Sequence, residues 1–127
     1  MTSRRDVDIV IEQVKKSFEN NEFQMWQTRK NGDFMRKLGW TYTQIQSYIC
    51  KNLCCDNYYK GPSANFSSTG GKGAIIWEFG MEVEIYEVYV KVSILEEDGE
   101  YRAACLSFHE CEYPIIYPFR KGSGING

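Results

Sequence analysis

The sequence predicts an α+β fold, in which a small antiparallel sheet of about three or four strands carries two or three helices packed on one face. Apolar residues recur at helical spacing in the first part of the chain, and they alternate with polar residues in three later segments. The 127 residues are 43% hydrophobic and 15% aromatic, which suffices for one core. We therefore expect a single domain over residues 1–121 and a disordered tail over 122–127.

The chain begins with an amphipathic helix and a short extended segment. Ser3 or Asp6 is available to cap the helix. Its apolar face is formed by residues at helical spacing, namely Val7, Val10, Ile11, Val14 and Phe18. Residues 23–28 predict a short strand, which the Asn31-Gly32 pair would close with a turn.

A second helix is predicted from about residue 42 to residue 54. Thr41 and Gln44 have the spacing of a capping box, and apolar side chains follow on one face: Ile45, Tyr48, Ile49 and Leu53. Residues 61–73 are rich in Gly, Ser and Asn, so we expect an exposed and mobile loop. The glycines and Lys72 in this loop do not form a phosphate-binding loop, because its first glycine and final hydroxyl residue are missing.

Three strands are predicted over residues 75–80, 87–94 and 104–109, where apolar and polar side chains alternate. His109 ends the third strand on the face turned away from the core. The side chains assigned to the core face are Ile75, Trp77, Phe79, Val88, Val90, Val92, Ile94, Ala104, Leu106 and Phe108. Residues 113–119 contain two prolines that exclude a central strand, so we expect an irregular aromatic strap packed on the domain.

Two registers compete for the hairpin between the second and third predicted strands. A two-residue Asp98-Gly99 turn would pair Val90 with Ser107, which sets a core face against a polar face. A three-residue loop with a left-handed Gly99 pairs Val90 with Leu106. We choose the three-residue loop because it matches the two core faces.

This choice gathers polar side chains on the face turned away from the core. Tyr89 would lie opposite Ser107, and Glu87 opposite His109. A reversal centred at residues 84–85 would also pair Trp77 with Val92 and Glu78 with Lys91. Such a face is often an ordinary solvated surface. Here, however, an imidazole, carboxylates, a phenol and an ammonium group converge, and histidine is suited to proton transfer near neutral pH.

Charge is distributed unevenly along the chain. The net charge of −2 argues against tight binding to nucleic acid by charge alone. Residues 1–60 hold ten Lys or Arg against seven Asp or Glu, whereas residues 78–112 hold ten acidic residues against Lys91 and Arg102. We expect an anionic partner to meet the helical half and the Arg120-Lys121 pair first.

The five cysteines match neither a disulfide framework nor a zinc site. Their number is odd and no signal peptide is evident, which predicts reduced thiols in a cytosol. A zinc site can be drawn from Cys50, Cys54, Cys105, His109 and Cys111, but it contains no CxxC pair. We therefore expect no metal and no cofactor. No apolar run approaches the roughly 18 residues that span a bilayer, so a cytoplasmic protein without membrane contact is expected.

Short motifs in both halves of the chain form a recognisable set. They are Tyr58-Tyr59-Lys60-Gly61-Pro62, Trp77-Glu78-Phe79-Gly80, Glu87-Val88-Tyr89-Val90-Lys91-Val92, and the run from Cys105 to Pro114 with Tyr117-Pro118-Phe119. Together they resemble the MqsR-type toxins of bacterial toxin–antitoxin pairs, over about residues 7–121. The resemblance implies a RelE-like fold and a metal-independent endoribonuclease that cleaves mRNA, free or on the ribosome. It also implies a cognate antitoxin protein, and no DNA binding is expected for the toxin alone.

The resemblance assigns catalytic roles residue by residue. The matching positions are Lys60, Glu78, Tyr89 and His109. The chain departs from a well-known member of the family at two of them, since that member has glutamine in place of Glu78 and lysine in place of His109. Related RelE-like nucleases do use glutamate and histidine. Tyr89 would orient the phosphate or stack on a base.

The expected reaction is attack of a ribose 2′-OH on the adjacent phosphate. Glu78, or failing that Glu87, would accept the 2′-OH proton, and His109 would protonate the leaving 5′-oxygen. Lys60 and Lys91 would stabilise the phosphoryl oxygens. The residues expected to bind substrate are Tyr59, Glu87, Lys91 and Ser107.

Two other functions are compatible with the sequence. A non-catalytic interaction module would bind a basic partner through the acidic strand region and the aromatic strap, with Tyr113 and Tyr117 as anchors. A metal-dependent hydrolase would use His109 and the cysteines, and it predicts bound zinc.

Overall fold

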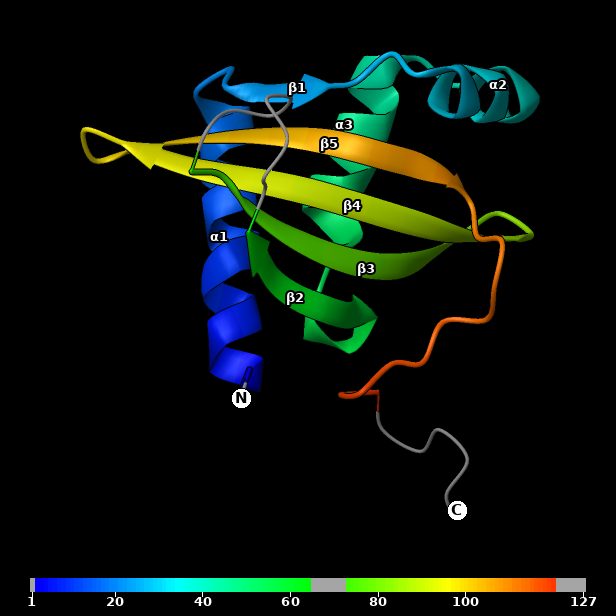
Figure 1. Ribbon diagram of the computed structural model, residues 1–127. Helices are drawn as coiled ribbons and strands as arrows, with labels where there is room; N and C mark the ends of the chain where they lie inside the picture. The colour runs from blue at the N-terminus through cyan, green and yellow to red at the C-terminus, as the bar shows by residue number, and fades with distance from the viewer. Residues whose placement is uncertain (1, 65–72, 121–127) are drawn as a thin grey trace.

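The computed structural model describes residues 2–64 and 73–120. These residues form an α+β fold of three α-helices and a five-stranded mixed sheet, which confirms the predicted fold class. The helices are α1 (Arg4–Glu19), α2 (Arg29–Leu38) and α3 (Tyr42–Asn52), and a 3₁₀ turn follows at Cys55–Asn57. The strands are β1 (Phe23–Met25), β2 (Tyr58–Ala64), β3 (Ile75–Val83), β4 (Tyr86–Glu97) and β5 (Glu100–Glu110), and their order in the sheet is β1-β5-β4-β3-β2 (Figure 1).

Both predicted helices are confirmed, and each begins with a capping box. The Ser3 hydroxyl accepts from the Asp6 N–H at 3.2 Å, and the Thr41 hydroxyl accepts from the Gln44 N–H at 3.1 Å. The apolar face of α1 is buried as expected, and α3 ends at Asn52 rather than at residue 54. The buried residues of the two helices are Val7, Val10, Ile11, Val14, Ser17, Ile45 and Ile49.

The helices and the sheet form two layers. α1 and α3 lie on one face of the sheet, behind the strands in the view of Figure 1, and the core lies between. Val88, Val90 and Val92 of β4 are fully buried there. α2 lies beside β5, and its Phe34 ring reaches the core within 5.9 Å of the Phe108 ring. No helix within residues 2–64 and 73–120 is long and apolar enough to cross a membrane.

The turn expected at Asn31-Gly32 is wrong, because both residues lie inside α2. The Thr28 side chain caps this helix by accepting from the Asn31 N–H at 3.2 Å. Gly39 ends it in the left-handed conformation with φ of 75°. Asn31 is 1% exposed, and its side chain bonds to β5 instead of forming a turn.

The loop expected at residues 61–73 is wrong in its first part. Gly61–Ala64 continue β2 and pair with β3, with Ser63 opposite Ile76. β2 is an edge strand, where a proline such as Pro62 is tolerated. Residues 65–72 of the expected loop, and the tail expected at 122–127, lie outside the described residues.

The sequence predicts an antiparallel sheet, but the sheet of the structure is mixed. β1 pairs with β5 in parallel, with Phe23 opposite Ala103, whereas the other neighbouring strands are antiparallel. The reversal expected at residues 84–85 is confirmed, because Trp77 pairs with Val92 and Glu78 with Lys91. The irregular strap after β5 is also confirmed, since residues 111–120 contain no helix or strand.

The predicted register between β4 and β5 is wrong. The chain makes the two-residue turn, with positive φ at Asp98 and Gly99 and Glu97 opposite Glu100. A β-bulge then inserts Leu106 between the pairs Val92–Cys105 and Lys91–Ser107. The extra residue restores the match between the two core faces, which the two-residue turn alone would have lost.

The bulge changes which β5 side chains face the helices. Cys105 belongs to the buried core cluster, whereas Ala104 and Leu106, which the sequence had assigned to the core face, do not. Beyond the bulge Phe108 faces the core as predicted. Tyr89 consequently lies opposite His109 rather than Ser107, and Glu87 does not pair with His109.

The side chain of Asn31 binds the bulge from the edge of the sheet. Its Nδ2 donates to the Leu106 carbonyl at 3.1 Å and to the Trp26 carbonyl at 2.9 Å. Its Oδ1 accepts from the Phe108 N–H at 2.9 Å. Asn31 thus provides the hydrogen bonds of a further strand where β1 has already ended.

Replacement of Asn31 by alanine is expected to lower the free energy of unfolding by about 2–4 kcal/mol, because buried polar groups of β5 lose their partners. Urea denaturation measures this change. Asn52→Ala is the control, since it removes an exposed side-chain bond from α3 to the Tyr48 carbonyl. Its effect should stay within about 0.5 kcal/mol, and equal losses in the two variants would contradict the role given to Asn31.

Candidate functional site

Four polar side chains form a first row across the sheet face opposite the helices. Lys60 of β2 pairs with Glu78 of β3, Glu78 with Lys91 of β4, and Lys91 with Ser107 of β5. Direct partners in adjacent strands have Cβ atoms about 4.5–5.5 Å apart. The register therefore places a carboxylate between two ammonium groups, with a hydroxyl at the end of the row.

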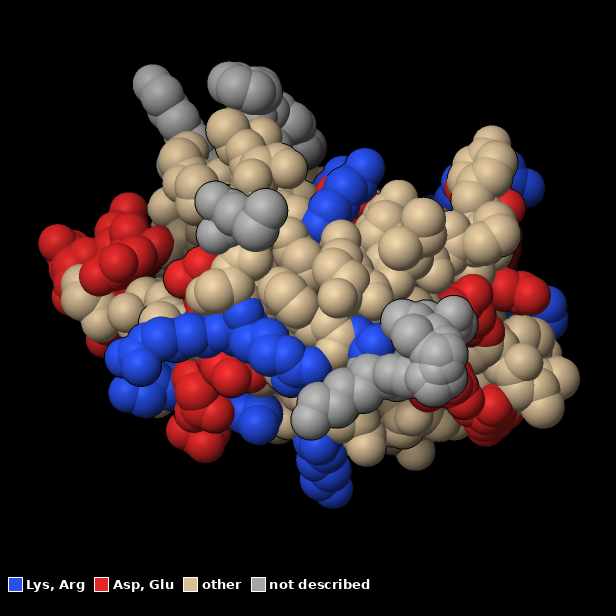
Figure 2. Space-filling view, turned by 90° about the horizontal axis from the view of Figure 1, so that it is seen from below, with Lys and Arg blue, Asp and Glu red and all other residues tan. Residues whose placement is uncertain are grey.

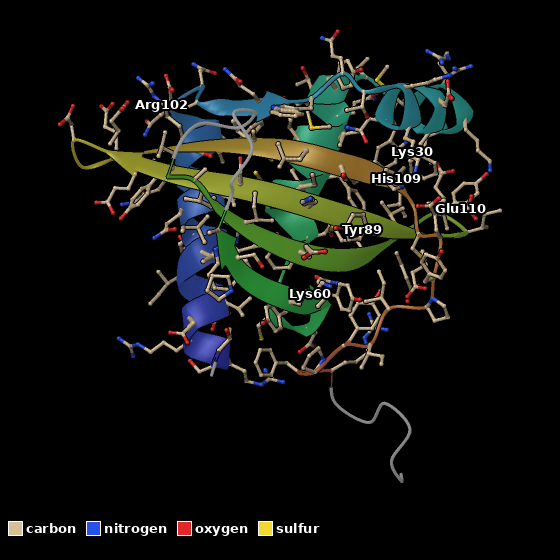
Figure 3. The ribbon with its side chains drawn as sticks, viewed as in Figure 1. Lys30, Lys60, Tyr89, Arg102, His109 and Glu110 are labelled. Atoms are coloured by element: carbon tan, nitrogen blue, oxygen red, sulfur yellow. The ribbon has the colours of Figure 1, made fainter. Side chains whose placement is uncertain are left out.

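A second row lies next to the first. Tyr89 of β4 pairs with Gly80 of β3 on one side and with His109 of β5 on the other. The Tyr89 and His109 rings are 5.7 Å apart and tilted by 47°. Figure 3 shows Lys60, Tyr89 and His109 following one another across the sheet from β2 to β5, with Lys30 of α2 beyond His109.

Members of both rows line a pocket of about 360 Å³. All four residues that were predicted to be catalytic line it, namely Lys60, Glu78, Tyr89 and His109. The remaining wall comes from β2, α2 and the chain after β5, and its members include Tyr59, Lys30, Tyr113, Pro114 and Ile115. The pocket therefore combines titratable groups on the sheet with aromatic and apolar side chains around them.

Glu78 and Tyr89 are joined by a short hydrogen bond. The Tyr89 hydroxyl donates to Oε1 of Glu78 at 2.5 Å. Burial, and then the bond to this carboxylate, raise the pKa of Tyr89 well above its usual value near 10. Tyr89 therefore stays protonated at neutral pH and acts as a donor, while Glu78 keeps a second oxygen for another proton.

His109 is oriented by the backbone of its own strand end. Its Nδ1 lies 3.1 Å from the Glu110 carbonyl oxygen. A carbonyl oxygen only accepts hydrogen bonds, so this contact requires a proton on Nδ1. Nε2 is then the ring nitrogen that exchanges a proton with a ligand.

Three residues expected to bind substrate do not line the pocket. Lys91 and Ser107 lie in the first row, and Glu87 lies farther toward the β3–β4 turn. Glu87 is engaged by the strap, because its Oε2 accepts from the Tyr117 hydroxyl at 2.7 Å and its Oε1 from the Cys111 thiol at 3.3 Å. Glu87 is consequently a poor substitute for Glu78 as a base.

In the structure the strap begins directly after β5, two residues earlier than predicted, and these residues, 111–119, pack on the sheet at Gly80. A Cβ atom at Gly80 would overlap the Tyr117 hydroxyl oxygen and would lie only 2.6 Å from Cδ1 of Ile115. Only glycine leaves room for this approach. The contact fixes the strap beside the second row, where Tyr113 and Ile115 complete the pocket wall.

Sequence reasoning missed Lys30 as a residue of the site. Lys30 lies in α2, which was not predicted, and it reaches the pocket because Asn31 holds α2 against β5. Pro114 and Ile115 were also missed as wall residues, although the aromatic strap itself was expected. Two residues could have predicted α2: Thr28, which is a favourable N-cap residue, and Gly39, which is a favourable residue at a helix C-terminus.

Cys111 lines the pocket with His109, whereas Cys50, Cys54 and Cys105 do not. Among the residues that the structure describes, no group of three or more His, Cys, Asp or Glu side chains is arranged to hold a metal ion. Burial raises the pKa of Cys105 to about 12 and that of Cys50 to about 11. Both therefore stay protonated and weakly nucleophilic thiols at neutral pH.

Charged side chains gather at separate places on the surface. Figure 2 shows acidic side chains at the end of the molecule where the β4–β5 turn lies, with Glu96, Glu97, Asp98 and Glu100. Basic side chains lie beside this end, over the first turns of α1, which begins with Arg4 and Arg5. The pocket lies toward the opposite end of the sheet, near the β3–β4 turn (Figure 3).

Comparison with protein-family models, with curated proteins and with solved structures finds no significant match to this chain. The resemblance to MqsR-type toxins and the RelE-like topology therefore stay predictions.

Replacement of Gly80 by alanine is expected to displace the strap, because the new methyl group would overlap Tyr117 and Ile115. Hydrogen–deuterium exchange over residues 111–119 should become at least about tenfold faster. Gly32→Ala is the matched control, since a Cβ there meets only the Arg36 side chain at 3.6 Å. Unchanged exchange in the Gly80 variant would show that the strap does not depend on this contact.

Proposed function

We propose that this protein is a metal-independent endoribonuclease that cleaves single-stranded mRNA, and that it acts as the toxin of a cytoplasmic toxin–antitoxin pair. The observation that carries the nuclease proposal is the pocket in which Lys60, Glu78, Tyr89 and His109 meet. These four residues come from four different strands. The toxin part of the proposal rests on the motif resemblance, which also suggests the cognate antitoxin.

The positions of Glu78 and His109 suit a cleavage that needs a base and an acid on two sides of a phosphate. Glu78 lies on β3 and His109 on β5, with β4 between them. Neighbouring strands are about 4.8 Å apart, so the two backbones are separated by about 10 Å. This separation leaves room for a phosphodiester between the two side chains.

In this mechanism Glu78 accepts the proton of the ribose 2′-OH as the 2′-oxygen attacks the adjacent phosphorus. The bond to the 5′-oxygen breaks, and the imidazolium of His109 donates its Nε2 proton to that leaving oxygen. The products are a 2′,3′-cyclic phosphate and a 5′-hydroxyl end. The base and the acid exchange roles if the cyclic phosphate is later hydrolysed by water.

Lys60 and Tyr89 support the same step without transferring protons. The Lys60 ammonium is 5.2 Å from the Tyr59 ring centre and lines the pocket, where it can offset charge on the phosphoryl oxygens. The protonated Tyr89 hydroxyl holds Glu78 in place through its 2.5 Å bond. Tyr59 offers an aromatic surface on which a base can stack.

The nuclease proposal is tested by incubating the protein with a single-stranded RNA in the presence of a metal chelator. The parent should release fragments with 2′,3′-cyclic phosphate ends. His109→Ala should lower the cleavage rate by about 10²- to 10⁴-fold, because the leaving oxygen loses its acid. Lys60→Ala should lower it through lost charge stabilisation by about 10²-fold or more.

Lys15→Ala serves as the control, because Lys15 lies on α1 and pairs with Glu12 on the helical side of the molecule. It should cleave RNA at the parental rate. Parental cleavage by the His109 variant would show that the assigned site is wrong. No cleavage by the parent, together with tight salt-sensitive binding of a basic protein, would favour the non-catalytic interaction module. Of its two expected anchors, Tyr113 is exposed, whereas Tyr117 is partly buried and bonded to Glu87.

A further inference from the structure

An ion pair joins α2 to the strap at the edge of the pocket. The Lys30 ammonium lies 3.1 Å from Oε1 of Glu112, and both residues line the pocket beside His109. The two side chains are 62% and 60% exposed. Exposed ion pairs of this kind contribute little to stability, so another anion can replace the carboxylate at low cost.

We propose that Lys30 binds an RNA phosphate next to the one that is cleaved, and that Glu112 occupies this phosphate site in the free protein. This inference rests on the proposed function and adds a second phosphate site to it. The carboxylate of Glu112 presents two anionic oxygens to Lys30, as the non-bridging oxygens of a phosphodiester would. Binding of RNA exchanges one anion for the other at the same ammonium group.

The place of Lys30 on the far side of His109 supports this role. Lys60, Tyr89, His109 and Lys30 follow one another from β2 to α2 in Figure 3. A strand of RNA with its cleaved phosphate between Glu78 and His109 continues in one direction over Lys30. The pocket wall there contains Tyr113, which is 80% exposed and can stack on the adjoining base.

A second ion pair on the same helix provides a matched control. Lys37 of α2 lies 3.2 Å from Oε1 of Glu110, and the two side chains are 53% and 52% exposed. Its ammonium sits over the Tyr86 ring at 4.8 Å, and Lys37 does not line the pocket. The two pairs are chemically alike, and both lysines line a hollow beside His109, but only Lys30 also lines the pocket that holds Glu78 and Tyr89.

The test is binding of a single-stranded RNA oligonucleotide that cannot be cleaved because each 2′-OH carries a methyl group, measured by fluorescence anisotropy over a range of salt concentrations. Lys30→Ala should weaken binding by about tenfold. It should also reduce the slope of log affinity against log salt by about 0.7, the value for one lost phosphate contact on a single strand. Glu112→Gln should strengthen binding by up to about fivefold, since the competing charge is removed.

Lys37→Ala should change neither the affinity nor the salt slope. Parental affinity and slope in the Lys30 variant, with a parent that binds and cleaves RNA, would overturn this inference and leave the proposed nuclease intact. Equal losses in the Lys30 and Lys37 variants would also overturn it, because they would indicate unspecific attraction to α2. A parent that neither binds nor cleaves RNA would contradict the proposed function and this inference together.

Discussion

The arrangement of the sheet depends on the hydrogen bonds between the Asn31 side chain and the bulge of β5. The β4–β5 turn alone would set core residues of one strand against polar residues of the other, and the extra residue Leu106 corrects this mismatch. β1 ends before it reaches the bulge, and Asn31 supplies partners for the Leu106 carbonyl and the Phe108 N–H with a nearly fully buried amide. The same bonds hold α2 against the sheet, so one side chain sets both the register and the position of a helix.

The candidate site is a consequence of that register. Beyond the bulge Phe108 enters the core, and His109 comes to lie opposite Tyr89 on the other face. Because α2 is fixed beside β5, Lys30 reaches the same pocket. The strap completes the pocket wall. Its close approach to Gly80 and the hydrogen bonds from Tyr117 and Cys111 to Glu87 hold it in place. The register of β5 therefore determines both the packing of the core and the grouping of polar side chains in the pocket.

Local patterns were sufficient for much of this structure. The capping boxes and apolar periodicity predicted α1 and α3, and alternation predicted β3, β4, β5 and the outward face of His109. The bulge could not be predicted, because its stability comes from Asn31, which is 75 residues away from Leu106 in sequence. For the same reason Asn31-Gly32 suggested a turn, and Lys30 was overlooked. Glu78, Tyr89 and His109 were nevertheless assigned to the face on which they lie, because each strand's own alternation fixes its face, whereas Lys60 was assigned to the site only through the motif resemblance.

The central claim is that the bulge places His109 beside Tyr89 at a site that binds RNA. His109 is the only histidine of the chain, so its imidazole signals in an NMR spectrum need no further assignment. The direct measurement is a titration of these signals with a non-cleavable single-stranded oligonucleotide, with contacts between ring protons recorded in the same samples. The account predicts contacts from His109 to a tyrosine ring in the free protein, and a change in the chemical shifts of the His109 imidazole when the oligonucleotide binds. Absence of ring contacts and unchanged imidazole shifts at saturating oligonucleotide would contradict it.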